Sequence, residues 1–184
     1  MVKILPFDKK RLLMKAFIES QFSYCPLIWM FCSRKMNKKI NHIHERALRL
    51  VYEDYTTHFE DLLVRDKSVS IHHQNIQKVA IEMFKVKNNL SPDFIKNLFF
   101  LANTCTRSNA SFRRPNVNTV YNGELSLRNF GPIVWDTMIP KSLKNITDLK
   151  EFKQKICKWV PKNCICRLCK EYVPNLGFAV VVED

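Results

Sequence analysis

Glycine is scarce in this sequence, with only 3 among 184 residues. Loops that cradle phosphate groups and tight turns between β-strands both depend on glycine, so its scarcity disfavours a P-loop and an all-β fold. Long apolar runs are also missing. The most apolar stretch, Phe22 to Cys32, is too short to span a bilayer and contains Pro26. We therefore interpret this stretch as buried core and expect no membrane partner.

Acidic residues are too few to balance the basic ones. There are 30 Lys and Arg against 17 Asp and Glu, and the resulting net charge of +13 is spread along the whole chain. Such a composition favours a polyanionic partner, and nucleic acid before membrane. A basic protein without any such partner is the alternative that composition alone leaves open.

The cysteines and the N-terminus indicate the compartment. The 7 cysteines are an odd number, and Lys9, Lys10 and Arg11 interrupt the first apolar stretch where a signal peptide would continue. We therefore expect a reducing, intracellular location, in the cytoplasm or the nucleus.

The cysteines near the C-terminus are the candidate metal ligands. Cys166 and Cys169 form one C-x-x-C pair, Cys164 is close enough in sequence to join them, and Cys157 lies on the preceding predicted helix. Zinc ribbons use two such pairs, so this irregular spacing favours free structural thiols. We expect no metal and no cofactor, and zinc binding by these four residues stays the alternative.

Helix start signals and apolar periodicity predict a mostly α protein. Thr57 and Glu60 form a capping-box pattern, and Thr147 or Asp148 is placed to cap the last helix. The chain divides into a helical bundle over 1–101, a loop-rich connector over 102–131, and a short helical, Cys-containing, basic extension over 132–184. The predicted helices cover 8–21, 23–31, 34–52, 57–65, 70–89, 92–99, a short stretch after Pro132, and 148–159.

The helix at 34–52 carries two distinct faces on a helical wheel. One is an apolar arc at helical spacing, which predicts a contact with another helix, and the other is a basic stripe that is long enough to follow several phosphates. Only Glu45 is acidic between residues 34 and 51. A solvated surface without a ligand is the alternative. The apolar arc comprises Met36, Ile40, Ile43, Ala47 and Leu50, and the basic stripe comprises Lys35, Lys38, Lys39, His42, Arg46 and Arg49.

Known catalytic patterns are incomplete in this sequence. His44-Glu45 begins the zinc-protease pattern H-E-x-x-H, but Leu48 stands where the second histidine is required. The segment VYEDY at 51–55 resembles a polymerase metal motif, yet Tyr55 replaces the second aspartate. We therefore assign no catalytic residue and expect that this chain is not an enzyme.

Four blocks of the sequence, in order, resemble the region downstream of the catalytic palm in reverse transcriptases of animal non-LTR (LINE-type) retrotransposons. The resemblance implies a thumb-like helical region and a C-terminal extension, with the endonuclease and the palm upstream of Met1. The family's catalytic aspartates have no matching positions here, so only the thumb's general role of holding template and primer carries over. The blocks are SQFSYCPLIWMFCSRKMNKKINHIHERALRLVYED, SVSIHHQNIQKVAIEMFKVKNNLSP, LRNFGPIVWDTMIP and FKQKICKWVPKNCICRLCKEYVPNLGF.

These observations together predict a C-terminal fragment of an RNA-directed DNA polymerase that binds the backbone of RNA and DNA without sequence readout. The basic stripe supplies the main contacts, and Arg113, Arg114 and the C-terminal lysines supply secondary ones. The alternative is a structural remnant whose apolar faces pack on the missing palm domain and which alone binds nothing.

Overall fold

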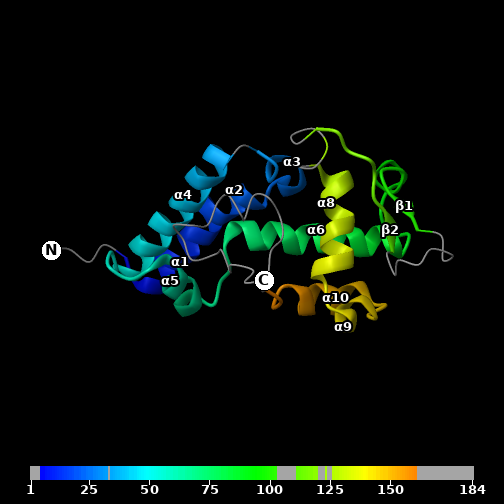
Figure 1. The fold of residues 1–184 in the computed structure, drawn as a ribbon. Helices are drawn as coiled ribbons and strands as arrows, with labels where there is room; N and C mark the ends of the chain where they lie inside the picture. The colour runs from blue at the N-terminus through cyan, green and yellow to red at the C-terminus, as the bar shows by residue number, and fades with distance from the viewer. Residues whose placement is uncertain (1–4, 33, 103–110, 120–122, 124–125, 161–184) are drawn as a thin grey trace, which may run out of the picture. The chain divides into compact units, whose positions relative to one another are not determined.

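The computed structural model describes residues 5–32, 34–102, 111–119, 123 and 126–160, and the mostly α fold class is confirmed (Figure 1). The described chain forms two compact units. The first lies within residues 5–72 and the second within residues 73–160. The boundaries expected at 101 and 131 fall inside the second unit, and the three-part division of the chain stays a prediction. In the part of the chain that the structure describes, every helix is too short or too polar to cross a bilayer.

All regular secondary structure in the described part of the first unit is helical. The predicted helix at 8–21 corresponds to three consecutive helical segments, of which the middle one is a π-helix. The elements are α1 (Phe7–Leu13), the π-helix η1 (Met14–Glu19), α2 (Ser20–Ser23), α3 (Pro26–Trp29), α4 (Arg34–Tyr52) and α5 (Phe59–Asp66).

The core of the first unit lies where α4 packs against α1, η1 and α5. Its buried apolar side chains come from three of these elements, and Ile18 and Tyr52 pack against them at the edge. This burial is the main source of stability for a helical unit of this size, because helix propensity alone is weak. The buried set comprises Met14, Ala47, Leu48, Val51, Phe59 and Leu63.

A buried carboxylate ties α1 to α4 and α5. Arg11 donates from Nε to Asp66 Oδ1 at 2.7 Å and from a terminal nitrogen to the Asp66 carbonyl at 2.8 Å. The Tyr52 hydroxyl donates to the same Oδ1 at 3.0 Å. Asp66 is only 2% exposed, so the bonds to Oδ1 replace part of the hydration that its carboxylate loses on folding, and Oδ2 has no hydrogen-bond partner among the described residues.

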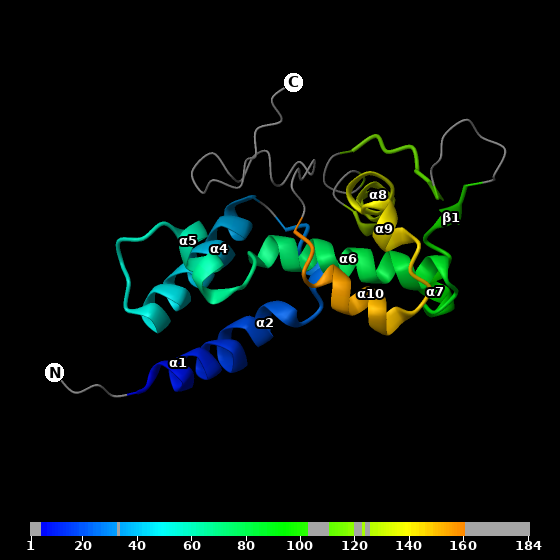
Figure 2. The same cartoon turned by 90° about the horizontal axis from the view of Figure 1, so that it is seen from below.

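The second unit surrounds α6 with shorter elements. In Figures 1 and 2, α10 lies beside α6 and α8 crosses it. Gln77 of α6 fixes the end of α10 by donating to the Trp159 carbonyl at 2.7 Å. The elements are α6 (Ile71–Lys87), α7 (Asp93–Lys96), β1 (Phe100–Leu101), β2 (Phe112–Arg113), α8 (Leu127–Ile133), the π-helix η3 (Val134–Met138), α9 (Lys141–Lys144) and α10 (Leu149–Ile156).

Aromatic rings fill the core of this second unit. Phe84 of α6 stacks on Phe152 of α10 with ring centroids 4.3 Å apart, and Trp135 of η3 lies 6.0 Å from Phe152. Phe112 of β2 meets Trp135 edge to face at 6.4 Å and Phe99 at 6.1 Å. These rings are all buried, so one cluster holds α6, β2, η3 and α10 together.

The helix expected after Pro132 begins earlier, at Leu127, and contains that proline. Proline lacks the N–H that would complete a helical hydrogen bond, so it interrupts the regular ladder. The chain continues as the π-helix η3, which ends where the Ile139 N–H donates to the Val134 carbonyl at 3.1 Å. The prediction of a helix in this region was right, and the position of its start was wrong.

Candidate nucleic-acid interface

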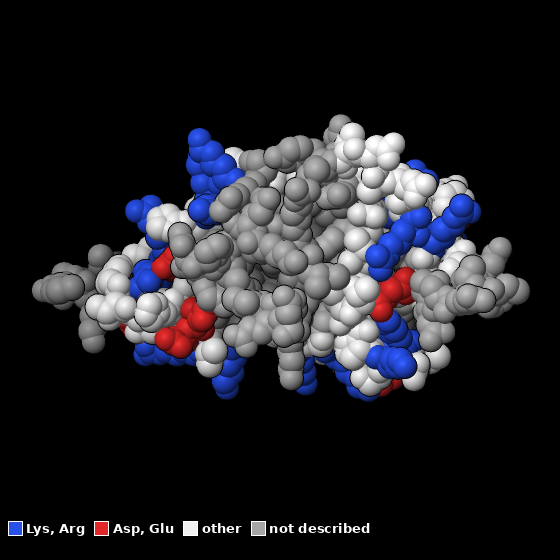
Figure 3. All heavy atoms as spheres, in the orientation of Figure 1, with Lys and Arg blue, Asp and Glu red and all other residues white. Residues whose placement is uncertain are grey.

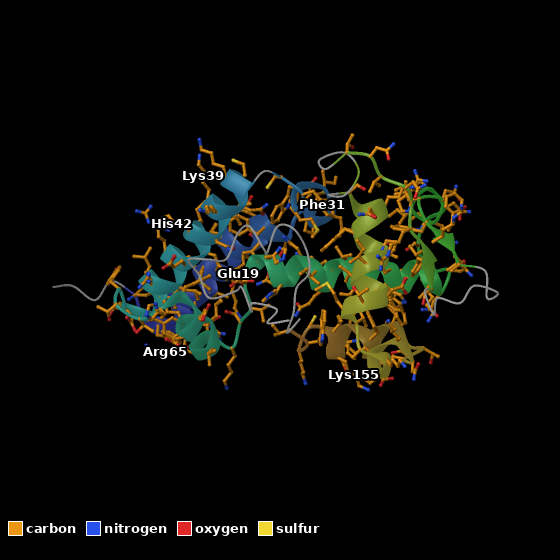
Figure 4. The ribbon with its side chains drawn as sticks, viewed as in Figure 1. Glu19, Phe31, Lys39, His42, Arg65 and Lys155 are labelled. Atoms are coloured by element: carbon orange, nitrogen blue, oxygen red, sulfur yellow. The ribbon has the colours of Figure 1, made fainter. Side chains whose placement is uncertain are left out.

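The basic stripe lies on a helix whose bounds are close to those predicted from the sequence, Arg34–Tyr52. Lys35, Lys38, Lys39, His42 and Arg46 are all exposed, and Arg49 is half-buried. In Figure 4, Lys39 and His42 point away from the ribbon of α4. Lys and Arg side chains also gather over the upper part of α4 in Figure 3. From Lys35 to Arg46 the stripe extends for about 16 Å at the helical rise.

Arg49 is the member of the set that the structure places differently. Its guanidinium donates to Glu45 Oε1 from both Nε and a terminal nitrogen, at 3.1 and 2.7 Å, and its side chain is only 19% exposed. Two charge-assisted bonds to one carboxylate oxygen neutralise the charge and hold the side chain against the helix. The exposed stripe therefore consists of Lys35, Lys38, Lys39, His42 and Arg46, and Arg49 serves a bond within the helix.

Ala47 is the one buried member of the predicted apolar arc, so the prediction that this arc forms the contact with another helix was largely wrong. Met36, Ile43 and Leu50 are 49%, 47% and 61% exposed, whereas Leu48 is fully buried and Val51 is 5% exposed. On a wheel of about 100° per residue, the buried face is turned by roughly 90° from the predicted one. It then lies almost opposite the basic stripe, so packing of α4 leaves the stripe free.

The buried face of α4 includes two polar residues, which explains the error. His44 is 0% exposed and Asn41 is 2% exposed. The His44 ring meets Phe59 of α5 edge to face, with centroids 5.6 Å apart. Burial lowers the pKa of His44 from 6.5 to about 4, against the opposing charge of Asp66, so the ring is neutral at pH 7. A prediction based on the spacing of apolar residues cannot identify a buried helix face that has a neutral histidine at its centre.

His44 therefore serves as a core side chain. Neither of its ring nitrogens has a hydrogen-bond partner among the described residues. The described side chains also contain no group of three or more His, Cys, Asp or Glu positioned to hold a metal ion. Of the four C-terminal cysteines, Cys157 is described as exposed and free. The other three, Cys164, Cys166 and Cys169, lie outside the described residues.

Arg113 and Arg114, the predicted secondary contacts, belong to the second unit, so the predicted set divides between the two units. Both side chains are exposed. They line a pocket of about 470 Å³ together with Arg128 at the start of α8 and Phe100 of β1. Sequence reasoning missed Arg128 and Phe100, because two-residue strands carry no periodic signal and Arg128 stands apart from other basic residues.

A further basic pocket occurs in the first unit, where it surrounds the buried carboxylate of Asp66. It measures about 540 Å³ and is lined partly by Arg11, Arg65 and Lys67. The Arg65 guanidinium lies 4.8 Å from the centroid of the Tyr52 ring, and Arg11 is bonded to Asp66. Two of these cations are thus engaged with neighbouring side chains, and we assign them a structural role.

No family model, curated protein or solved structure matches this chain.

Proposed function

We propose that this chain binds the backbone of RNA and DNA without sequence readout. In this proposal it is the thumb-like, C-terminal part of a retrotransposon RNA-directed DNA polymerase that lacks the catalytic palm. The observation that carries the proposal is the exposed stripe of Lys35, Lys38, Lys39, His42 and Arg46 on the side of α4 that faces away from the core. Four permanent cations on one helix face complement a row of phosphates and make no demand on base identity.

The charge distribution within α4 supports this assignment. Glu45 is the only acidic residue of the helix, and it is bonded to Arg49, so it does not neutralise the four permanent cations of the stripe. An ordinary solvated helix mixes charges of both signs and gains from pairs four residues apart. Here the uncompensated cations repel one another, and an anionic ligand removes that repulsion.

The test compares two variants with the same change in net charge. The stripe variant replaces Lys35, Lys38, Lys39 and Arg46 with Gln, and the matched control replaces the exposed Lys9, Lys15, Lys150 and Lys153 with Gln. Fluorescence anisotropy at one salt concentration measures affinity for several unrelated single strands and duplexes. We expect the stripe variant to bind all of them more weakly than the control, by a similar factor for every sequence.

The alternative is a structural remnant that packs on a missing palm domain and binds nothing alone. The exposed side chains of Met36, Ile43 and Leu50 favour it, because they form an apolar strip along α4 beside the basic stripe. If the wild type does not bind, this alternative replaces the proposal. If the wild type binds and both Gln variants bind equally well, the stripe is not the binding surface and its assignment is wrong.

The proposal also holds that the chain has no polymerase activity and resides inside the cell. Two-metal phosphoryl transfer requires convergent carboxylates, and the aspartates of the related polymerases have no matching positions in this sequence. Primer extension on an RNA template with the purified chain should equal the control without enzyme. Magnesium-dependent extension would show that a catalytic site was overlooked.

A further inference from the structure

The pocket in the second unit is formed by the β1–β2 pair and by the first turn of α8. Phe100 pairs with Arg113 and Leu101 pairs with Phe112 in this antiparallel ladder. Directly opposed residues place their side chains on the same face of the two strands. Phe112 is 1% exposed and faces the aromatic core, so Phe100 and Arg113 share the outer face, where Phe100 is 57% exposed.

The strand that carries Arg113 is held in place by the core. The Ser111 N–H donates to Asp136 Oδ1 at 2.9 Å, and the Phe112 ring packs edge to face on Trp135. Both partners belong to η3. A site on a strand anchored in this way is better positioned than one on a free loop.

Three guanidinium groups surround the pocket without a compensating acid. Arg113, Arg114 and Arg128 line it, and its lining among the described residues includes no Asp or Glu. None of the three forms an ion pair with a described residue, in contrast to Arg49 of α4. Guanidinium groups match the geometry of phosphate oxygens and bind them through paired N–H donors. In Figure 3, Lys and Arg side chains gather over the region of β1 and β2.

An aromatic ring stands beside these cations. The Arg128 guanidinium carbon lies 6.0 Å from the centroid of the exposed Phe100 ring. Exposed aromatic rings next to arginine are the elements that stack bases of unpaired strands and hold the adjoining phosphates. A duplex does not present the face of an internal base, so the ring distinguishes the two forms of nucleic acid. A phosphopeptide site needs the arginines but has no use for an exposed ring.

We propose that this pocket holds one nucleotide of an unpaired strand, with its base stacked on Phe100 and its phosphate bound by Arg113, Arg114 and Arg128. The inference rests on the proposed binding of nucleic acid, but it concerns a different unit and a different contact. It adds a preference for single strands to the backbone binding of α4. The wall of the pocket also includes Leu98 and Asn116, which supply apolar area and one amide beside the base.

The experiment uses the full chain and a short single strand that contains the fluorescent base 2-aminopurine. Phe100→Leu keeps apolar area and removes the ring, and Phe100→Tyr restores a ring. The matched control is Phe94→Leu, which changes an aromatic side chain of α7 that is 71% exposed and does not line the pocket. We expect Phe100→Leu to weaken single-strand binding about 5- to 100-fold and to abolish quenching of the 2-aminopurine. Phe100→Tyr and Phe94→Leu should behave like the wild type.

The charged part of the site is tested by Arg128→Gln. This change should lower the salt slope for single strands by about 0.7, and Phe100→Leu should leave the slope unchanged because it removes no charge. Neither Phe100→Leu nor Phe94→Leu should alter affinity for a blunt duplex. A phosphoserine peptide that competes as well as the single strand would contradict the assignment to a nucleotide.

The outcomes separate the two proposals. If Phe100→Leu binds single strands like the wild type while the stripe variant of α4 loses affinity, the pocket is not a nucleotide site and the proposed function stands. If Phe100→Leu loses single-strand affinity and the stripe variant does not, the pocket is supported and the role of α4 is wrong. If the wild type binds neither form of nucleic acid, both proposals fail.

Discussion

His44 and Asp54 of the first unit couple the stability of this protein to pH. His44 is buried beside Phe59, and its pKa is lowered to about 4 because burial disfavours the imidazolium. Asp54 acts in the same direction, at a lower pH. Hydrogen bonds from Thr57 and Thr56 lower the pKa of this partly buried carboxylate from 3.8 to about 2. The carboxylate therefore favours the folded state above pH 3.8, and that contribution disappears as the pH falls through 2.

For His44, the sign of the effect follows from proton uptake. The unfolded chain binds a proton near pH 6.5 and the folded chain only near pH 4, so the free energy of unfolding should fall as the pH is lowered between these values. A shift of this size corresponds to about 3 kcal/mol, and no such loss occurs above pH 7. Urea denaturation at a series of pH values measures it.

Two variants identify the residue responsible for this slope. His44→Leu removes the titrating group and keeps an apolar side chain of similar size, so most of the slope between pH 4 and 6.5 should vanish. His42→Leu changes an exposed histidine of the same helix, keeps His44, and should retain the wild-type slope. An unchanged slope in His44→Leu would mean that another group controls the acid response.

At the level of elements, the sequence predicted the existence and bounds of the long helices better than the faces they bury. The bounds of α4 and the exposed Lys and Arg of its stripe were predictable, because charged side chains avoid the core. The buried face was not predictable, since two apolar arcs compete on this helix and the buried one includes Asn41 and His44. The contact of α4 with α5 buries the arc that contains Asn41 and His44.

The helix caps were also predictable only where they depend on neighbouring residues in the sequence. Asp148 caps α10 as expected, accepting a hydrogen bond from the Glu151 N–H at 2.7 Å. The capping box expected at Thr57 does not form, because α5 begins at Phe59 and the Thr57 hydroxyl donates to Asp54 at 2.7 Å. The Thr57 hydroxyl bonds to the nearby Asp54 carboxylate and not to the backbone of the helix. The spacing of Thr57 and Glu60 alone cannot reveal this competing acceptor.

The reassigned face of α4 can be tested with two identical substitutions. Leu48→Ala removes a side chain that is 0% exposed and should reduce the free energy of unfolding by about 2 to 5 kcal/mol. Leu50→Ala removes one that is 61% exposed and should change it by less than about 0.5 kcal/mol. Chemical denaturation of both variants provides the comparison. Equal losses would show that the originally predicted arc is buried.

For the molecule as a whole, basic residues are spread along the chain and some of them also gather on two exposed surfaces. The first unit presents the stripe of α4, and the second unit presents three arginines around one pocket. Net charge alone predicted a polyanionic partner, and the pattern of burial indicates which cations are available to it. The pocket depends on the pairing of Phe100 with Arg113, which only the folded chain brings together.

The most direct test of the central claim is the salt dependence of duplex binding, measured between about 50 and 200 mM salt. Each phosphate contact contributes about −0.9 to the slope of log affinity against log salt. Replacing Lys35, Lys38, Lys39 and Arg46 with Gln should therefore flatten the slope by roughly 3 to 4. The control that changes Lys9, Lys15, Lys150 and Lys153 should keep a slope close to that of the wild type. If the two variants show the same slope, the position of the cations on α4 is irrelevant, and the account of this helix as a nucleic-acid interface is wrong.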